Sequence, residues 1–264
     1  MSKEMKKVQV LDHGYLAVVE TWGSDERIIE SARMSTGKGF IGWGREECRA
    51  CGDFPTQPKT PRACPGDGRD GKHEWYRIPG DEKLLSFLRE NHHDTPFEFA
   101  GMVVEVQAPI FVFREWHRHR TQSYNEMSAR YTPLPDVNYV PTGERLLINS
   151  KTNKQAGVVA GAEELTTEKA EWFRQRLVEV YAEDESLYQR ALSWGVPKEL
   201  ARVHLPVGRY SRMRASANLR NWLGFATLRS APSAQWEIQQ YSDAILVMLR
   251  EAFPRTLELF DERK

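Results

Sequence analysis

The sequence predicts an α+β fold on three observations. Two short segments rich in apolar and β-branched residues, 8–11 and 15–20, flank an Asp-His-Gly turn at 12–14, which is the pattern of a β-hairpin. Apolar residues recur at helical spacing from Thr167 to about Ser193, much further than one strand extends. The predicted strands and helices do not alternate as β-α-β units, so a purely parallel sheet is not expected.

The N-terminal half contains two further predicted helices and a strand. Ser24 can cap a helix that runs to about Arg33, because acidic residues follow it and favour a helix N-terminus. Residues 81–91 place leucines on one helical face, and residues 99–107 alternate as a strand does. Pro109 suits the first position of a helix, so we expect a helix directly after that strand.

The C-terminal half is predicted to be mainly helical. The long helix capped by Thr167 has an apolar stripe made of Phe173, Leu177, Val180, Tyr181 and Leu187. The remaining elements are expected in this order: a loop over 118–131 before the long helix, then a short helix over 197–202, a strand over 209–217, a helix over 218–228, and a last helix that Ser233 caps and Pro254 interrupts.

Between the first two predicted helices, the character of the chain changes. Gly, Pro, Cys and charged residues dominate residues 37–80, and hydrophobic periodicity disappears. We therefore expect one domain spanning residues 1–264, with a Gly/Cys-rich loop or mini-module inserted at about 37–80.

The insert begins with a misleading motif. Its residues 37–42, Gly-Lys-Gly-Phe-Ile-Gly, match the pattern G-x-G-x-x-G. A dinucleotide-binding fold needs a strand before this pattern and a helix after it, whereas here a helix precedes and a loop follows. We expect no Rossmann site.

The insert also contains every cysteine of the chain. Cys48, Cys51, Cys64 and His73 follow the spacing C-x2-C-x12-C-x8-H and form a candidate structural zinc site remote from catalysis. A metal would help a hydrophilic insert to fold. Two alternatives stay open: an aspartate, at 67 or 70, replaces the histidine as a ligand, or the three thiols bind no metal.

Composition narrows the class of protein. The chain has 264 residues with 40% hydrophobic content, enough for a sizeable core, and its formal net charge is +0. Proteins that bind nucleic acid or anionic lipid through bulk charge are usually more basic, so any anion site must be local. The charged residues 1–7 are not followed by an apolar segment, and no apolar run approaches a membrane span. We expect a cytoplasmic location.

A strong local positive charge lies between Arg114 and Tyr131. Four arginines and two histidines stand there against Glu115 and Glu126. Arginine binds phosphate through paired N–H donors and keeps its charge at any relevant pH. The residues alone therefore indicate a site for a phosphorylated small molecule. The alternative is a solvated basic surface, or a loop whose arginines bind backbone carbonyls.

The order of residues in this loop resembles a known signature. Residues 118–131 match R-H-R-x-x-S-x-N-x-x-S-x-R at every fixed position, with Tyr131 following. The pattern resembles that of the flavin-dependent thymidylate synthases. The likeness extends over nearly the whole chain except about 37–80, through A-R-M-S at 32–35, H-D-T-P-F-E at 93–98, Arg202, L-P at 205–206, N-L-R at 218–220, L-R at 228–229 and A-Q-W-E-I-Q at 234–239.

The resemblance implies a fold, a reaction and an assembly. The fold would be that of the thymidylate synthase complementing proteins, a mixed or antiparallel sheet with long helices. The reaction would convert dUMP to dTMP, with methylenetetrahydrofolate as carbon donor and FAD, reduced by NADPH, as hydride donor. The protein would be a homotetramer with active sites between subunits, and it would bind neither nucleic acid nor membrane.

The resemblance also assigns residues to the ligands. The expected FAD contacts are His93, Thr95, Arg118, His119, Arg120, Glu126, Asn218 and Arg220. The expected dUMP contacts are Glu115, Arg118, Glu126, Met127, Ser128, Ala129, Arg130, Arg202 and Arg229.

Arg229 is the predicted catalytic residue. A cation at the N3–C4=O edge of uracil favours the electron-rich ring that must attack the methylene carbon. Taken alone, Arg229 is better explained as an arginine that binds the last carbonyls of a helix, and the surrounding match with the family favours the catalytic role. Ser128 is interpreted as a positioning residue rather than a nucleophile, because no base is adjacent to it in sequence. No cysteine has the Pro-Cys-Gln setting of the cysteine-dependent thymidylate synthase.

Two positions depart from the family pattern. Residue 115 is Glu where many members have Gln, so it accepts hydrogen bonds but cannot donate them, and its role is open. Residue 224 is Gly where many members have a polar side chain towards FAD, so it can offer only its backbone.

Two other functions compete with this one. A nucleic-acid-binding module would use the basic loop and a zinc knuckle, but the neutral chain lacks a basic stripe interleaved with aromatic residues. An inactive relative would bind FAD and nucleotide only, which the intact residues 118–131 and Arg229 disfavour.

Overall fold

The computed structural model describes residues 7–49, 75–148, 158 and 161–261. It divides into two compact units. Unit 1 comprises Met1–Thr21 and Gly101–Leu249, and unit 2 comprises Trp22–Ala100 and Arg250–Lys264. Within the described residues, no helix is long and apolar enough to cross a membrane.

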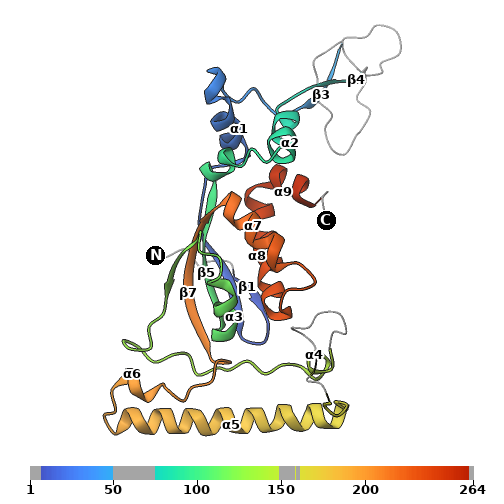
Figure 1. Ribbon diagram of the computed structural model, residues 1–264. Helices are drawn as coiled ribbons and strands as arrows, with labels where there is room; N and C mark the ends of the chain where they lie inside the picture. Colours follow the sequence, from blue (N-terminus) through green and yellow to red (C-terminus); the bar gives the residue numbers. More distant parts are fainter. Residues whose placement is uncertain (1–6, 50–74, 149–157, 159–160, 262–264) are drawn as a thin grey trace. The chain divides into compact units, whose positions relative to one another are not determined.

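Unit 1 is built on a five-stranded sheet with strand order β1-β2-β5-β7-β6 (Figure 1). The strands are β1 (Lys7–Val10), β2 (Gly14–Trp22), β5 (Gly101–Pro109), β6 (Ser123–Glu126) and β7 (Tyr210–Asn218). β1 pairs antiparallel with β2, and β7 pairs antiparallel with both β5 and β6. The sheet confirms the predicted α+β fold and the hairpin at its N-terminal edge.

One face of this sheet forms the core. Met102, Val104, Val106 and Ala108 alternate along β5 and are fully buried, whereas the residues between them are partly exposed. This is the pattern of an antiparallel sheet with one covered face. Three helices supply the other side of the core: α3 (Ile110–Trp116), α7 (Leu219–Arg229) and α8 (Trp236–Ala252).

An aromatic cluster joins these helices. The ring of Trp116 lies 4.7 Å from that of Phe225, 6.3 Å from that of Trp222 and 6.2 Å from that of Tyr241. The buried polar groups are satisfied at the sheet, where Trp222 Nε1 donates to Met102 O at 2.9 Å and Tyr241 Oη donates to a β5 carbonyl at 2.8 Å. The C-terminal end of α3 and the middle of α7 are therefore fixed against the sheet.

The remaining helices of unit 1 are α4 (Gly143–Leu147), α5 (Thr167–Ser193) and α6 (Lys198–Ala201). α5 lies beside α4 and α6 (Figure 1). Its N-cap is Thr166, one residue before the predicted Thr167. The predicted apolar stripe is not buried as expected, because Phe173 and Leu187 are 44% and 52% exposed, while the buried positions are Ala170 and Tyr188.

Unit 2 contains α1 (Asp25–Arg33), η1 (Met34–Thr36), β3 (Arg45–Cys48), β4 (Trp75–Ile78), α2 (Glu82–Glu90), η2 (Thr95–Phe99) and α9 (Pro254–Asp261). Ser24 caps α1 as predicted, with Arg27 N donating to its hydroxyl. Asp25 is 3% exposed and accepts from Thr256 Oγ1 at 2.6 Å, which joins α1 to α9. Burial raises the pKa of Asp25, and these hydrogen bonds oppose the increase.

The predicted insert starts and ends in an antiparallel hairpin, β3–β4. Acidic side chains bind its base, since Asp81 pairs with Arg33 and accepts from Ile41 N at 2.8 Å, and Glu82 accepts from Gly44 N at 2.6 Å. A Cβ on Gly80 would lie 2.1 Å from Gly44 N, so glycine is required there. The G-x-G-x-x-G pattern follows a helix and precedes β3, as expected for a sequence that is not a Rossmann motif.

Candidate active site

The basic loop starts where α3 ends, and hydrogen bonds from side chains of the same segment stabilise its first turn. Trp116 Nε1 donates to the buried Gln122 Oε1 at 3.0 Å. Tyr124 Oη donates to His119 O at 2.7 Å and lies 3.2 Å from Trp116 O. The backbone of residues 116–122 is therefore fixed by two side chains of the loop itself.

The middle of the loop is a strand, which corrects the prediction of a loop throughout 118–131. β6 pairs with β7, with Ser123 opposite Ser216 and Glu126 opposite Met213. Ser123 and Asn125 are exposed, whereas Tyr124 between them is only partly exposed. Sequence reasoning missed the role of Tyr124, although alternation of polar residues with an aromatic residue indicates a half-buried edge strand.

Arg229 is the last residue of α7. Its guanidinium is bound by groups of α3 and of the turn that follows α3. Nε donates to His119 Nε2 at 2.8 Å, Nη1 donates to Glu115 Oε2 at 2.9 Å, and Nη2 donates to Glu115 O at 2.7 Å. The predicted catalytic residue thus lies against two predicted ligand contacts that are more than 100 residues away in sequence. Its side chain is 15% exposed, so its charge is only partly screened by water.

The environment of Arg229 sets the protonation of its neighbours. Burial, together with the cation of Arg229, lowers the pKa of His119 to about 4, although Glu115 opposes this. His119 is therefore neutral near pH 7, and its Nε2 can accept the hydrogen bond from Arg229. Burial raises the pKa of Tyr124 to about 12, so its hydroxyl stays a donor to the loop.

Arg118 and Arg120 have a different environment. Both are exposed, and no residue in the described part of the chain forms an ion pair or hydrogen bond with either guanidinium. A backbone hydrogen bond of 3.2 Å from Arg120 N to Arg118 O keeps the turn tight. Two cations on a fixed turn, without a neutralising carboxylate, suit the diphosphate of a dinucleotide.

The second half of the basic loop contacts α6. Arg130 Nε donates to Glu199 at 3.0 Å, and Lys198 Nζ donates to Tyr131 O at 2.9 Å. Arg202 follows directly after α6, so it belongs to the same neighbourhood as Arg130. The pair of Arg130 with Glu199 is more than half exposed on both sides, so solvent screens it and a phosphate can replace the carboxylate.

Residues 126–129 connect these two neighbourhoods. Met127 N donates to Arg212 O at 2.7 Å, which extends the pairing of the loop with β7. Ser128 Oγ accepts from Arg130 N at 3.3 Å, and Ala129 is buried. Among the described residues, no hydrogen bond or ion pair joins Ser128 to a histidine or lysine, and its role as a positioning residue stays a prediction.

The N-terminal end of α7 meets the loop as well. Asn218 caps the helix by accepting from Asn221 N at 3.0 Å, and Asn221 Nδ2 donates to Thr121 O at 3.2 Å. Arg220 is exposed in the first turn, and Gly224 is exposed, with open space where a Cβ would lie. Asn218 and Arg220 are thus joined to the same side of the loop as His119.

Two sets of predicted residues are not among these contacts. His93 and Thr95 are exposed residues of unit 2, so their roles remain predictions. Of the predicted zinc ligands, Cys48 is buried on β3, whereas Cys51, Cys64 and His73 lie outside the described residues. In the described part of the chain, no group of three or more metal-ligand side chains is present, and the zinc site remains a prediction.

Comparison with known proteins identifies the family. The sequence model described as "Thymidylate synthase complementing protein" (Thy1) matches residues 17–255. A flavin-dependent thymidylate synthase from Thermosipho africanus is 33% identical over 252 residues, which are 96% of this chain and 92% of the relative. One from Thermus thermophilus is 34% identical over 257 residues, which are 97% of this chain and 78% of the relative.

Solved structures agree with this result. The crystal structure of a UMP/dUMP methylase, PolB from Streptomyces cacaoi bound with 5-Br UMP, is similar with a TM-score of 0.71 and 26% identity, covering 97% of this chain and 96% of that one. The same methylase bound with 5-Br dUMP gives a TM-score of 0.71 and 27% identity, covering 97% of both chains. The chain belongs to the thymidylate synthase complementing protein family, and the resemblance read from residues 118–131 is confirmed.

Proposed function

We propose that this protein is a flavin-dependent thymidylate synthase that methylates dUMP reductively to dTMP. The observation that carries the proposal is the Arg229 cluster, where the guanidinium is bound by Glu115 and His119 beside a fixed basic turn. The reaction is proposed because the relatives in this family are flavin-dependent thymidylate synthases. The geometry of the Arg229 cluster supports the view that this chain retains the groups that the reaction needs. We further propose that the two units work as one catalytic domain.

FAD fits the residues that are present. Arg118 and Arg120 offer two cations without a neutralising partner in the described part of the chain, and Asn218 and Arg220 adjoin them through α7. With His93, Thr95, His119 and Glu126, these residues would hold FAD. The flavin, reduced by NADPH, supplies the hydride, and methylenetetrahydrofolate supplies the carbon.

Arg229 would act on the pyrimidine ring. Carbon–carbon bond formation at C5 requires electron density that is delocalised over N3, C4 and O4. A guanidinium at this edge stabilises the negative charge that develops there, an effect typically worth about 3 to 4 kcal/mol. Because Glu115 and His119 already orient the guanidinium, little reorganisation is needed when the ring becomes charged.

The nucleotide phosphate would bind at the other end of the loop. Arg130 and Arg202 lie around α6, and the exposed Glu199 that now pairs with Arg130 can be exchanged for a phosphate dianion. Backbone and side-chain groups of 126–129 would contact the rest of the nucleotide.

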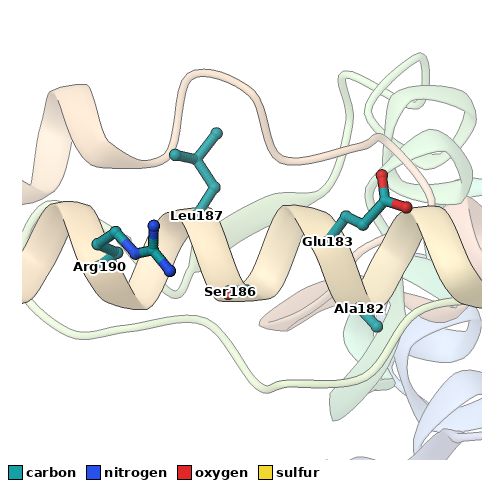
Figure 2. A pocket seen from close by; sticks show the side chains of 5 residues that line it. All are labelled: Ala182, Glu183, Ser186, Leu187 and Arg190. Atoms are coloured by element: carbon teal, nitrogen blue, oxygen red, sulfur yellow. The ribbon is translucent and has the colours of Figure 1, made fainter.

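A homotetramer would also account for α5. This 27-residue helix buries only Ala170 and Tyr188, while Trp172 and Val178 are 66% and 53% exposed. Figure 2 shows a hollow on the same helix, lined by Ala182, Glu183, Ser186, Leu187 and Arg190. Large apolar side chains and small residues on one helix suit packing against another copy of the chain.

The proposal is tested by purifying the protein, recording its spectrum and comparing wild type with Arg229→Ala. Wild type is expected to be yellow, to lose flavin absorbance when NADPH is added, and to release tritium from C5-labelled dUMP only with methylenetetrahydrofolate. Arg229→Ala is expected to keep FAD and to lose at least about 100-fold in turnover. A matched Glu30→Gln variant, which removes an exposed surface pair of α1, should leave turnover unchanged.

Each contrary result has a distinct meaning. Protein that stays colourless after incubation with FAD would overturn the flavoenzyme assignment. Flavin reduction without tritium release would indicate an inactive relative, and turnover of UMP instead of dUMP would indicate a ribonucleotide methylase. Near-normal turnover of Arg229→Ala would remove that residue from the mechanism.

A further inference from the structure

Glu115 accepts two hydrogen bonds from Arg229 and stands at a fixed position of its helix. Its carboxylate accepts from Arg229 Nη1, its own backbone carbonyl accepts from Arg229 Nη2, and its position on α3 is fixed because Trp116 next to it is fully buried. The backbone contact would persist with any side chain, but the carboxylate contact depends on residue 115 itself.

The remaining donors of Arg229 can be counted. A guanidinium has five N–H groups. The described contacts use one on Nε, one on Nη1 and one on Nη2, so each of the two Nη atoms retains one N–H. Two donors on neighbouring atoms match two neighbouring acceptors, such as O4 and a deprotonated N3 of uracil.

The charge of Glu115 acts on the same edge. The charged or titratable groups that face Arg229 are Glu115 from α3, His119 from the basic turn and Tyr124 from β6, and Asp243 of α8 binds the adjacent Ser230. His119 and Tyr124 are neutral near pH 7, so the carboxylate that directly contacts the guanidinium is that of Glu115.

We infer that Glu115 is a positioning residue: it fixes the guanidinium plane of Arg229, leaves its two remaining Nη donors for the pyrimidine, and moderates the positive charge that the ring meets. This inference rests on the proposed function. It gives a role to residue 115, which is Glu here and Gln in many members of the family. An amide at 115 would keep the acceptor and remove the negative charge.

The sign of the effect follows from electrostatics. The cation of Arg229 stabilises the N3-deprotonated form of a bound pyrimidine and lowers the pH at which N3 ionises. The carboxylate of Glu115 opposes that stabilisation. Removing the charge should therefore lower the midpoint of N3 ionisation further, by about 0.5 to 1 pH unit for one charge at roughly 6 Å in a partly solvated site.

The experiment uses FAD-loaded enzyme and 5-fluoro-dUMP, without folate or reductant, so that no turnover occurs. The 19F resonance of the bound nucleotide is followed against pH, and its dissociation constant is measured, for wild type, Glu115→Gln, Glu115→Ala and the surface control Glu30→Gln. The two Glu115 variants are expected to lower the midpoint by similar amounts. Glu115→Ala should also bind the nucleotide about fivefold or more weakly than Glu115→Gln, because it loses the acceptor.

The outcomes separate the inference from the function on which it rests. An unchanged or higher midpoint in Glu115→Gln would overturn the charge effect, and equal affinity of the Gln and Ala variants would overturn the positioning role. In both cases nucleotide binding by wild type would leave the proposed function intact. Failure of wild type to bind the nucleotide would overturn the function and the inference together.

Discussion

At the scale of single residues, this chain places its proposed catalytic charge among groups that keep it oriented. Arg229 meets a neutral imidazole and a carboxylate that come from one helix and the turn after it. The identity of each group was visible in the sequence, but their relationship was not, because more than 100 residues separate Arg229 from both partners. The structure also shows that the carboxylate of Glu115 is paired with this arginine.

The protonation of His119 predicts how stability depends on pH. Its pKa is lowered to about 4 in the folded protein from an ordinary value of 6.5, so protons bind the unfolded chain more tightly. The contribution of His119 to the free energy of unfolding is therefore complete above about pH 6.5 and decreases as the pH falls towards 4. Urea unfolding of FAD-free wild type and His119→Gln at several pH values measures this, and the advantage of wild type should shrink on acidification.

The control for this measurement is His13→Gln, which changes an exposed histidine in the β1–β2 turn. This substitution leaves the contacts of Arg229 intact, so it measures the effect of replacing a histidine elsewhere in the chain. A constant difference between wild type and His119→Gln from pH 7 to pH 4 would contradict a neutral His119 bound to Arg229.

At the scale of elements, α7 connects the sheet to both ends of the proposed site. Its N-terminal residue Asn218 caps the helix and adjoins the loop, and its C-terminal residue is Arg229. Trp222 and Phe225 anchor its middle in the core, so the spacing between the two ends is set by a rigid helix. Sequence periodicity predicted this helix within one residue, because its caps and buried stripe are local features.

Two variants of Asn218, the N-cap of α7, can distinguish its effect on stability from its effect on cofactor binding. Asn218→Asp keeps an acceptor for Asn221 N and adds a favourable charge at the helix N-terminus, so stability should be unchanged or higher. It removes the amide donors and places a negative charge at the proposed FAD site, so the affinity for FAD should fall about tenfold or more. Asn218→Ala should instead lose about 1 kcal/mol of stability with the cap.

Thermal or urea unfolding of the FAD-free proteins, together with flavin titration, measures both quantities. Equal loss of stability in the two variants would show that the cap contributes nothing. Unchanged FAD affinity in Asn218→Asp would remove this residue from the cofactor site.

At the scale of the whole molecule, most of the surface of α5 is exposed within unit 1. The helix is held through a narrow stripe, where Tyr181 Oη donates to Tyr139 O at 3.2 Å, Arg174 Nε donates to Pro141 O at 2.9 Å, and Glu185 pairs with the buried Arg209 at 2.6 Å. The apolar stripe predicted from the sequence is real as a pattern, but much of it is exposed within one chain. A sequence cannot state whether an apolar face is covered by its own chain or by another copy.

Charges on this face should prevent assembly. Phe173 and Leu187 lie on one side of α5, and burying two unpaired carboxylates there is unfavourable by several kcal/mol. The double variant Phe173→Glu, Leu187→Glu is therefore expected to have a smaller mass than wild type in light scattering or sedimentation, and to lose turnover if the active site lies between subunits. Glu179→Gln, an exposed position of the same helix, serves as control. A tetrameric, active double variant would contradict this interface.

The sequence by itself determined the family, the main helices and strands, and the basic loop with its ligand-binding residue types. These features depend on local order, such as motif spacing, hydrophobic period and caps, which neighbouring residues specify. Tertiary structure decided what depends on distant residues: that 123–126 becomes an edge strand on β7, that Tyr124 fixes the turn, and that α5 has an unburied face. It also decided the partners of Arg229, because only the packing of α3 and α7 around shared core aromatics brings Glu115 and His119 to that guanidinium.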